Sequence, residues 1–320
     1  MDKNMTLLVQ YTLLFSSILI LVALGGCFSE HSGVINLGLE GTMVMGALGG
    51  ALVLRVFEKN APDANGFLVV VTALLAAVFV GVLFSLLLAV ASVSFKADQT
   101  LVGTAMNMLG TALATVIVKA LNTAESKDNV SSTVEYIRTS KNFWVQIGGF
   151  RFNWMILVTA VVLVAAYVVL YKTRFGLHLL SCGENPQAAD SVGINVYRVR
   201  YAGVMISGAL GGLGGITYII VGAQQWQFEY GVAGFGFLAL AVMIFGQWKP
   251  TRIALAALLF GLFRALSNVY TGIDFLKALN LPGALYNMMP YIVSLIVLAC
   301  TSRKSRAPKA EGIPYDKGAR

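Results

Sequence analysis

An amide and a carboxylate stand four residues apart, among three glycines, at the start of a long apolar segment. The stretch reads Gly33-Val34-Ile35-Asn36-Leu37-Gly38-Leu39-Glu40-Gly41. A carboxylate at the start of a membrane span is costly unless it meets a cavity, a partner or the interface, so it marks a candidate site. On a helix, Asn36 and Glu40 would share one face and could hydrogen-bond the hydroxyls or ring edges of a substrate. A structural role also fits, with Glu40 capping or pairing locally, for example with His31.

The composition places these residues in a membrane protein. Hydrophobic residues make up 57% of the 320 residues and charged residues only 12%, about half the charged fraction of a soluble domain. Apolar runs of about 18 residues or more predict transmembrane helices. We expect nine spans, with ten as the alternative, and therefore an all-α polytopic membrane fold. The nine are about 6–26, 34–56, 67–93, 101–121, 152–171, 201–222, 232–248, 252–270 and 285–301.

The distribution of charge predicts the orientation. Residues 172–200, the pair Lys249 and Arg252, and the tail 302–320 together carry the net charge of +8. The positive-inside rule places all three on the cytoplasmic side, so we expect a cytoplasmic C-terminus and, by counting spans, an outer N-terminus. A basic tail can also indicate nucleic acid, but orientation accounts for it and we expect no such partner. Arg264 lies toward the outer part of its span, where Glu229 or Asp274 could pair with it, although snorkelling to the outer headgroups is the simpler interpretation.

A weak internal repeat relates two glycine-containing segments. Residues 33–45 and 231–243 match at five positions with an offset of 198. The copies lie in the second and seventh predicted spans, with four spans between them, so they cross in opposite directions. Inverted repeats place a substrate path at their interface, with helices broken near the midplane. We therefore expect one transmembrane domain, 1–301, with an inverted repeat whose halves are about 6–171 and 201–301.

Other positions suggest packing or substrate contact. The G-x-x-x-G pairs Gly46/Gly50, Gly208/Gly212 and Gly211/Gly215 predict close helix contacts. Four residues join Asn36 and Glu40 as candidates for the substrate path, namely Asn107, Gln225, Trp226 and Phe235. Interhelical hydrogen bonding explains an amide such as Asn107 about as well. An aromatic ring beside amides, as at Trp226, suits stacking on a base, although an interfacial aromatic belt fits too.

The loop 172–200 contains a short helix signal. It includes Gly183-Glu184-Asn185-Pro186-Gln187-Ala188-Ala189 and, a little later, Gly193-Ile194. Asn185 can cap a helix that begins at Pro186, and Gly193 fits the stop. Such a helix, outside the membrane, either docks its small face into a groove on another protein or is a connector that touches nothing.

Three motifs, in order along nearly the whole chain, carry a resemblance to a known family. They are Ser32–Gly41, Gly183–Ala189 with Gly193-Ile194, and Gly236-Phe237-Leu238-Ala239-Leu240-Ala241 with Phe245-Gly246. The chain resembles the permease subunits of bacterial ABC importers for branched-chain amino acids, ribose and nucleosides, most closely the nucleoside-type branch. The resemblance implies that a loop docks on a separate ATP-binding subunit. The residues that would couple to the ATPase are Gly183, Glu184, Asn185, Pro186, Ala188, Ala189 and Gly193.

The expected function is therefore transport rather than catalysis. The chain would be the permease subunit of an ATP-driven nucleoside importer in the bacterial inner membrane, with riboflavin or a simple sugar as alternative substrates. It would pair with a second permease, similar or identical, and receive substrate from an extracytoplasmic binding protein. A stand-alone secondary transporter is the competing class, because inverted repeats and a midplane carboxylate suit it too.

The absence of several motifs supports that expectation. The sequence has no G-x-x-x-x-G-K-[ST] phosphate loop, no H-E-x-x-H and no evident Ser/His/Asp constellation. We therefore expect no catalytic residue on this chain and ATP on the partner subunit. The three cysteines have no paired spacing, so neither a disulfide nor a bound metal or cofactor is expected.

Overall fold

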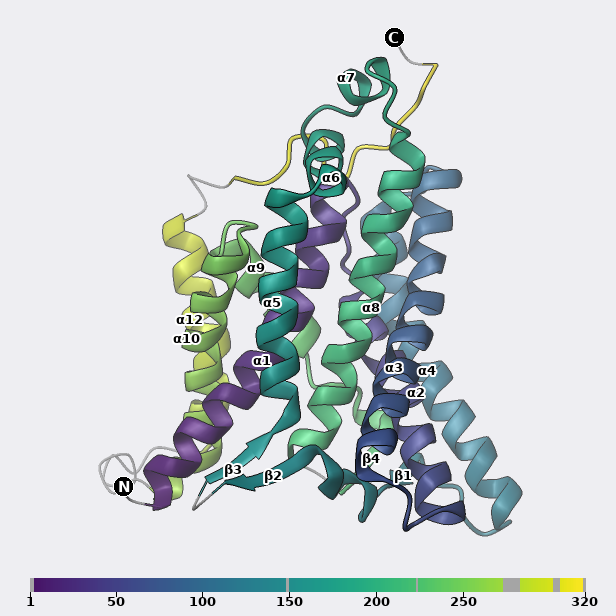
Figure 1. Ribbon diagram of the computed structural model, residues 1–320, viewed down its shortest axis with the longest axis vertical. Helices are drawn as coiled ribbons and strands as arrows, with labels where there is room; N and C mark the ends of the chain where they lie inside the picture. Colours follow the sequence, from purple (N-terminus) through teal and green to yellow (C-terminus); the bar gives the residue numbers. More distant parts are fainter. Residues whose placement is uncertain (1–2, 148–149, 223, 273–282, 302–305, 319–320) are drawn as a thin grey trace.

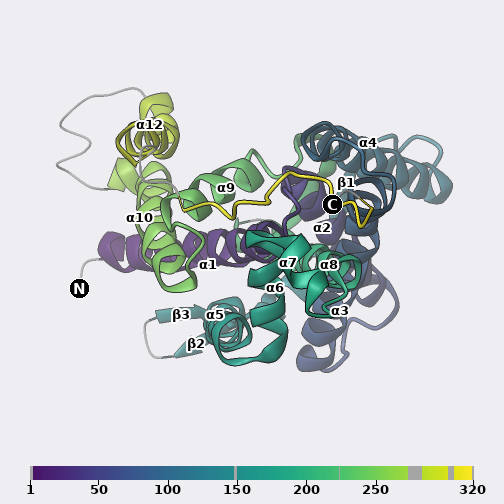
Figure 2. The ribbon, with the colours of Figure 1, turned by 90° about the horizontal axis from the view of Figure 1, so that it is seen from above.

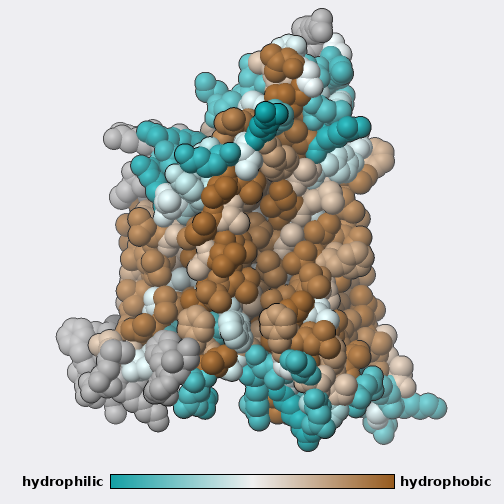
Figure 3. Space-filling view, viewed as in Figure 1, coloured by the Kyte–Doolittle hydropathy of each residue, from teal (hydrophilic) through white to brown (hydrophobic). Residues whose placement is uncertain are grey.

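The computed structural model describes residues 3–147, 150–222, 224–272, 283–301 and 306–318. In this part of the chain, eight helical segments are long and apolar enough to cross a membrane. On the face shown in Figure 3, an apolar belt lies between two polar ends. The all-α polytopic membrane fold predicted from hydropathy is confirmed.

The α-helices alternate in direction along the bundle (Figure 1). They are α1 (Lys3–His31), α2 (Leu39–Asn60), α3 (Gly66–Ala89), α4 (Gln99–Glu125), α5 (Trp154–Lys172), α6 (Arg174–Glu184), α7 (Pro186–Ser191), α8 (Val196–Gly222), α9 (Phe235–Phe245), α10 (Pro250–Val269) and α12 (Gly283–Thr301). Short turns of other helix types are η1 (Val90–Ser94), η2 (Thr139–Phe143), η3 (Phe228–Tyr230) and η4 (Tyr270–Gly272). Two small antiparallel sheets pair β1 (Thr133–Glu135) with β4 (Gln225–Gln227) and β2 (Trp144–Ile147) with β3 (Phe150–Asn153).

Different elements of the chain lie at the two polar ends of the bundle (Figure 1). We name the end with α6, α7 and residues 306–318 the tail end, and the opposite end, with the four strands, the sheet end. The N-terminus lies at the sheet end and the C-terminus at the tail end. This division gives each crossing a direction, which matters for the site below.

Helix α1 runs through the middle of the bundle, as seen from above in Figure 2. It packs against α8, α10, α9 and α5, and Leu14, Ile18 and Leu21 are completely buried. Helix α3, by contrast, leaves Leu75 and Phe79 exposed, as expected of a surface that faces lipid. Apolar residues cover both kinds of surface because lipid tails are as apolar as the core.

Glycines set the close approach of α8 to α2 and α3, as the G-x-x-x-G pairs predicted. A Cβ atom built on Gly46 of α2 would collide with the Cα of Gly212 on α8, and one on Gly81 of α3 would collide with the carbonyl oxygen of Gly208. A Cβ on Gly215 would collide with the carbonyl oxygen of Met43. These contacts leave no room for a side chain, so the three helices pack backbone to backbone.

Two predicted spans begin before their helices do. In the span 34–56, α2 starts only at Leu39, and within 232–248 the helix α9 covers Phe235–Phe245. The repeat predicted broken helices in these two segments, and each has a non-helical stretch before its helix. Val34 is completely buried although it lies before α2. Hydropathy reports burial rather than helix formation, so a non-helical segment inside the bundle looks like part of a span. The ninth predicted span, 285–301, falls within α12 (Gly283–Thr301).

Candidate functional site

Two interrupted crossings meet inside the bundle at the starts of α2 and α9. Helix α2 runs from there to the sheet end, where Glu58 accepts a hydrogen bond from the backbone N–H of Arg138 at 3.0 Å. Helix α9 runs the other way, and beyond it the carbonyl oxygen of Trp248 lies 3.0 Å from Nε2 of His31 at the tail end of α1. We name the meeting place, formed by residues 32–41 and 231–236, the junction. Two helix N-termini in opposite directions thus face one another there.

Glu40 joins the two helices at the junction. Its carboxylate accepts hydrogen bonds from the backbone N–H groups of Gly234 at 2.8 Å and Gly236 at 2.6 Å. A carboxylate is well placed at this point, because the first N–H groups of a helix lack partners within it and carry partial positive charge. Gly234 has a φ of +78°, and a Cβ on Gly236 would lie 2.5 Å from the backbone nitrogen of Glu40. The close approach therefore requires glycine.

Two asparagines hold the other side of the junction. The side chain of Asn107 on α4 accepts from the N–H of Gly41 at 2.9 Å and donates to the carbonyl of Leu37 at 2.8 Å. Asn36 is completely buried; its amide donates to Ser207 Oγ at 2.9 Å and accepts from the N–H of Gly38 at 3.0 Å. Helix α2 has no side-chain cap of its own at Gly38, so α4 supplies one.

The helical face predicted for Asn36 and Glu40 is wrong, because Asn36 precedes α2 and lies in the non-helical segment. Both side chains, and that of Asn107, are engaged by the protein itself. The pairing of Glu40 with His31 is also wrong, since His31 contacts Trp248. Direct contact of Asn36, Glu40 or Asn107 with a substrate stays a prediction.

Trp226 and Phe235 come together in a group of aromatic rings on the sheet-end side of the junction. The ring of Tyr218 lies 5.3 Å from Trp226 and 4.7 Å from Phe235, centroid to centroid. Trp226 Nε1 donates to the carbonyl of Gly231 at 3.1 Å, which attaches the group to the non-helical segment before α9. Gln225, in contrast, is exposed on strand β4 opposite Glu135.

Arg264 was expected to snorkel toward lipid headgroups, and this is wrong. Its guanidinium carbon lies 5.5 Å from the ring centroid of Phe235 and 6.0 Å from that of Phe15, beside the junction. Its Nε atom is buried and has no hydrogen-bond partner among the described residues. Glu229 pairs with Lys119, and Asp274 lies outside the described residues. The sequence held no signal for this contact, because α1, α9 and α10 supply one residue each.

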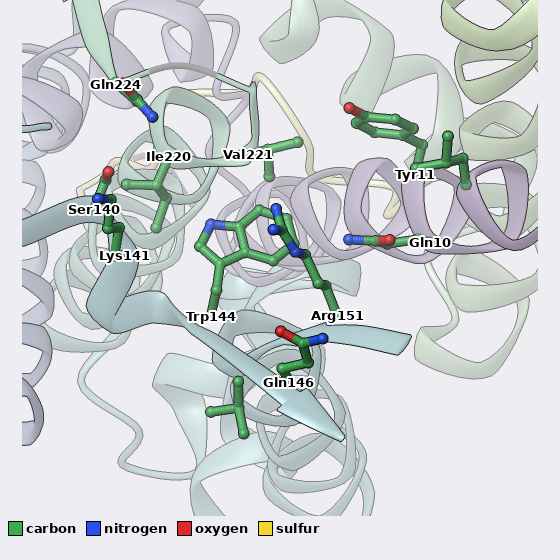
Figure 4. A pocket seen from close by; sticks show the side chains of 12 residues that line it. Gln10, Tyr11, Ser140, Lys141, Trp144, Gln146, Arg151, Ile220, Val221 and Gln224 are labelled. Carbon is green, nitrogen blue, oxygen red and sulfur yellow. The ribbon is translucent and has the colours of Figure 1, made fainter. Parts of the chain in front are cut away.

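A cavity of about 580 Å³ opens at the sheet end between α1, α8 and the β2–β3 hairpin. Figure 4 shows Trp144 and Arg151 from the hairpin opposite Gln10 and Tyr11 of α1. Its lining combines the aromatic rings of Tyr11 and Trp144, three glutamine amides, and the cations Lys141 and Arg151, groups that can stack on a polar solute and hydrogen-bond it. Sequence reasoning missed this cavity because its walls come from three separated segments.

The short helix predicted to start at Pro186 is confirmed as α7. Asn185 caps it by accepting from the N–H of Ala188 at 3.0 Å, and Pro186 occupies the first turn. Pro186 and Ala189 are buried, whereas Glu184, Asn185 and Ala188 are exposed. Gly193 has a φ of +88° after the helix, a conformation that favours glycine. A Cβ on Gly183 would collide with the carbonyl oxygen of His31, so α6 lies directly against the end of α1.

Comparison with known proteins decides the family. Residues 8–298 match the family model described as the branched-chain amino acid transport system permease component. The chain belongs to this permease family. The guanosine ABC transporter permease protein NupQ of Bacillus subtilis (strain 168) is 39% identical over 99% of this chain and 98% of its own length. The nucleoside ABC transporter permease protein NupC of Lactococcus lactis subsp. cremoris (strain MG1363) is 40% identical over 98% of each. The putative glucose ABC transporter permease protein TsgC13 of Haloferax volcanii is 32% identical over 81% of this chain and 76% of its own length.

The permease folds its C-terminal segment back across the tail end (Figure 1). Of the predicted basic tail 302–320, residues 302–305 and 319–320 lie outside the described residues. In residues 306–318, the N–H of Ala310 donates to the carbonyl of Gly183 at 2.8 Å, and the carbonyl of Ile313 accepts from Arg200 Nη1 at 2.9 Å. Ion pairs join Asp316 to Lys96 at 2.9 Å and Lys317 to Asp190 at 3.6 Å. The tail therefore connects α6, α7 and α8 with the corner after η1.

Glu311 is the residue through which we expect the contacts of this tail to depend on pH. Burial raises the pKa of the Glu311 carboxyl to about 7, and one of its oxygens is buried without a hydrogen-bond partner in the described part of the chain. Glu30, at the end of α1, lies near enough to repel it electrostatically. While the tail is bound to α6, α7 and α8, the raised pKa favours the protonated form of Glu311. Binding of the tail is therefore strongest below the ordinary pKa of a glutamate and weakens as the pH rises through about 7.

We expect the protection of the Ala310 amide against hydrogen exchange to fall about tenfold from about pH 5 to about pH 8, after correction for intrinsic exchange rates. This is less than the full shift allows, because the side chain of Glu311 is partly exposed and water screens it. Glu311→Gln, which stays neutral, should keep the acid-form protection throughout. An equal pH dependence in that variant would show that another group controls the tail.

Proposed function

We propose that this chain is the membrane permease subunit of an ATP-driven nucleoside importer of the bacterial inner membrane. The observation that carries the proposal is the match, over nearly the whole length, to two permeases whose names specify guanosine and nucleosides. The glucose-type relative is less similar and covers less of the chain, so a simple sugar, like riboflavin, is the weaker alternative. This chain forms the path and does no covalent chemistry.

The polar ends take different partners under this proposal. The tail end carries the basic segments and is cytoplasmic by the positive-inside rule. There α6 and α7, with Glu184, Asn185 and Ala188 exposed, dock on the ATP-binding subunit. The sheet end faces outward and receives nucleoside from an extracytoplasmic binding protein. A second permease, similar or identical, completes the path.

Rearrangement at the junction moves the substrate across the membrane. Helix α2, of 22 residues, and the shorter α9, of 11, start at the junction and run in opposite directions, each after a non-helical segment. This is the arrangement that broken helices use at transport sites. Docking at α6 reaches the junction by a short route, since Gly183 lies against His31 and residues 32–38 follow directly. ATP binding and hydrolysis on the partner would thus rock this region between outward- and inward-open arrangements.

Uptake of labelled guanosine and uridine tests the function. Cells with and without this chain, with its partner subunits present, should differ, and the difference should vanish on ATP depletion while excess ribose or riboflavin leaves it unchanged. Uptake that survives ATP depletion would instead identify a secondary transporter. Uptake of riboflavin or sugar in place of nucleoside would support the permease function but show that the proposed substrate is wrong.

Ala188→Arg is expected to reduce ATP-dependent uptake at least about tenfold without changing the amount of permease in the membrane. Ala188 is exposed on α7, so a bulky cation there blocks a groove on a partner but does not disturb the fold. Ala188→Ser, which stays small, is the matched control. Pro186 is unsuitable for this test because it is buried. Normal uptake by the arginine variant would rule out docking through α7.

A further inference from the structure

Arg264 is an unusual group for the apolar belt of this permease. It lies on α10, five residues before the helix ends at Val269, and no carboxylate among the described residues forms an ion pair with it. Glu40, the acidic residue of the junction, is bonded to backbone N–H groups instead. A charged side chain inside a membrane is costly and usually marks a substrate path or a partner. The rings of Phe15 and Phe235 offset part of the cost, since each faces the guanidinium.

The surroundings of Arg264 are connected to the sheet-end cavity by aromatic rings. Tyr11, which lines that cavity on α1 (Figure 4), is stacked on Phe15 with 6.1 Å between ring centroids. Phe15 lies 5.8 Å from Phe235, and Phe235 lies 4.7 Å from Tyr218. The rings thus form a continuous series from the cavity to the junction, and Arg264 lies over its second and third members. Phe235 is completely buried and Phe15 nearly so, so a base meets these rings only when the transport cycle separates them. Aromatic faces accept any planar base and cannot distinguish one base from another.

We propose that Arg264 is a specificity-determining residue of the transport path, which recognises bases that present two adjacent hydrogen-bond acceptors. This rests on the proposed nucleoside function. A guanidinium donates two parallel hydrogen bonds, and the N7 and O6 atoms of guanine or hypoxanthine match that geometry. Adenine presents an amino donor beside N7 and opposes the second N–H. The permease therefore favours 6-oxopurine nucleosides over adenosine.

The unpartnered Nε of Arg264 supports the same assignment. A buried donor without a partner is costly, and a substrate that supplies an acceptor removes the cost, whereas one that supplies a donor adds to it. The selectivity for 6-oxopurine nucleosides then arises after the binding protein has delivered the substrate. Because residues of this chain determine it, a substitution in this chain alone changes it.

The test is the ratio of guanosine to adenosine uptake by the complete transporter, with the binding protein and ATPase unaltered. Arg264→Gln replaces the paired donors with one donor and one acceptor, the pattern that pairs with adenine, so the ratio should fall about tenfold while adenosine uptake persists. Arg252→Gln, on the same helix at an exposed position, is the matched control and should keep the wild-type ratio. An unchanged ratio in Arg264→Gln overturns the proposal and leaves the nucleoside function standing. A wild-type transporter that takes up no nucleoside overturns both.

A second measurement covers variants that reach the membrane but do not transport. Guanosine should raise the melting temperature of the purified wild-type complex more than adenosine does. Loss of that difference in Arg264→Gln supports the assignment, and its retention overturns it. Because both nucleosides are compared in the same variant, a general loss of stability does not affect the outcome.

Discussion

Glu40→Ala is expected to lower the free energy of unfolding by about 3 kcal/mol or more and to abolish uptake. The carboxylate accepts two short backbone hydrogen bonds from residues that precede and begin α9, and each bond to a charged group contributes about 1.5–3 kcal/mol. Without it, the N–H groups of Gly234 and Gly236 lose their partner inside the membrane, where water cannot replace it. Chemical or thermal unfolding of the permease in lipid nanodiscs measures the first effect, and nucleoside uptake measures the second.

Glu58→Ala is the matched control, because Glu58 also accepts hydrogen bonds from backbone N–H groups. It bonds Arg138 at 3.0 Å and Thr139 at 2.9 Å, but at the sheet end, where water is available. We expect a loss of about 1 kcal/mol, typical of a helix cap, with uptake retained. If Glu40→Ala costs no more than Glu58→Ala, the carboxylate does not hold the two helices together at the junction.

The sequence predicted the crossings well because a membrane imposes one simple requirement on them. A span needs about 20 apolar residues with every backbone group bonded internally, and hydropathy detects the first condition. Hydropathy cannot detect where backbone groups are bonded by side chains instead of by other backbone groups of a helix. Between His31 and Leu39 the backbone is satisfied by side chains such as Gln99, which accepts from the N–H of Ile35 at 2.7 Å. The helix start at Leu39 was therefore missed.

The sequence indicated which polar residues belong to the site, but not which groups they form hydrogen bonds with. Asn36, Glu40 and Asn107 stand out as polar residues in apolar runs, and local signals alone predicted α7, since Asn185 and Pro186 are adjacent. The partners of Glu40 lie nearly 200 residues away in the chain, and a backbone N–H has no signature in sequence. The same reason explains why Arg264 was misjudged and why the tail was interpreted only as charge, although Ala310 bonds the backbone of Gly183.

Gly212→Ala is the other change for which we expect a large loss of stability, because the packing leaves no space for the added methyl group. A Cβ at Gly212 would collide with the carbonyl oxygen of Ala77 on α3, and backbone cannot rotate aside as a side chain can. We expect the free energy of unfolding to fall by about 3 kcal/mol, the upper part of the range for overpacking, with uptake reduced in proportion to the folded permease.

Gly211→Ala is the control for this change, since it lies next to Gly212 on the same helix. Its Cβ would meet only the Thr42 side chain, whose methyl group is 3.0 Å away, and a small shift of that group removes the contact. The gain in helix propensity from glycine to alanine is the same at both positions, so the difference between the two variants isolates the packing of α8 against α3. Equal stability of the two would mean that the helices separate easily, and that the G-x-x-x-G spacing does not fix their distance.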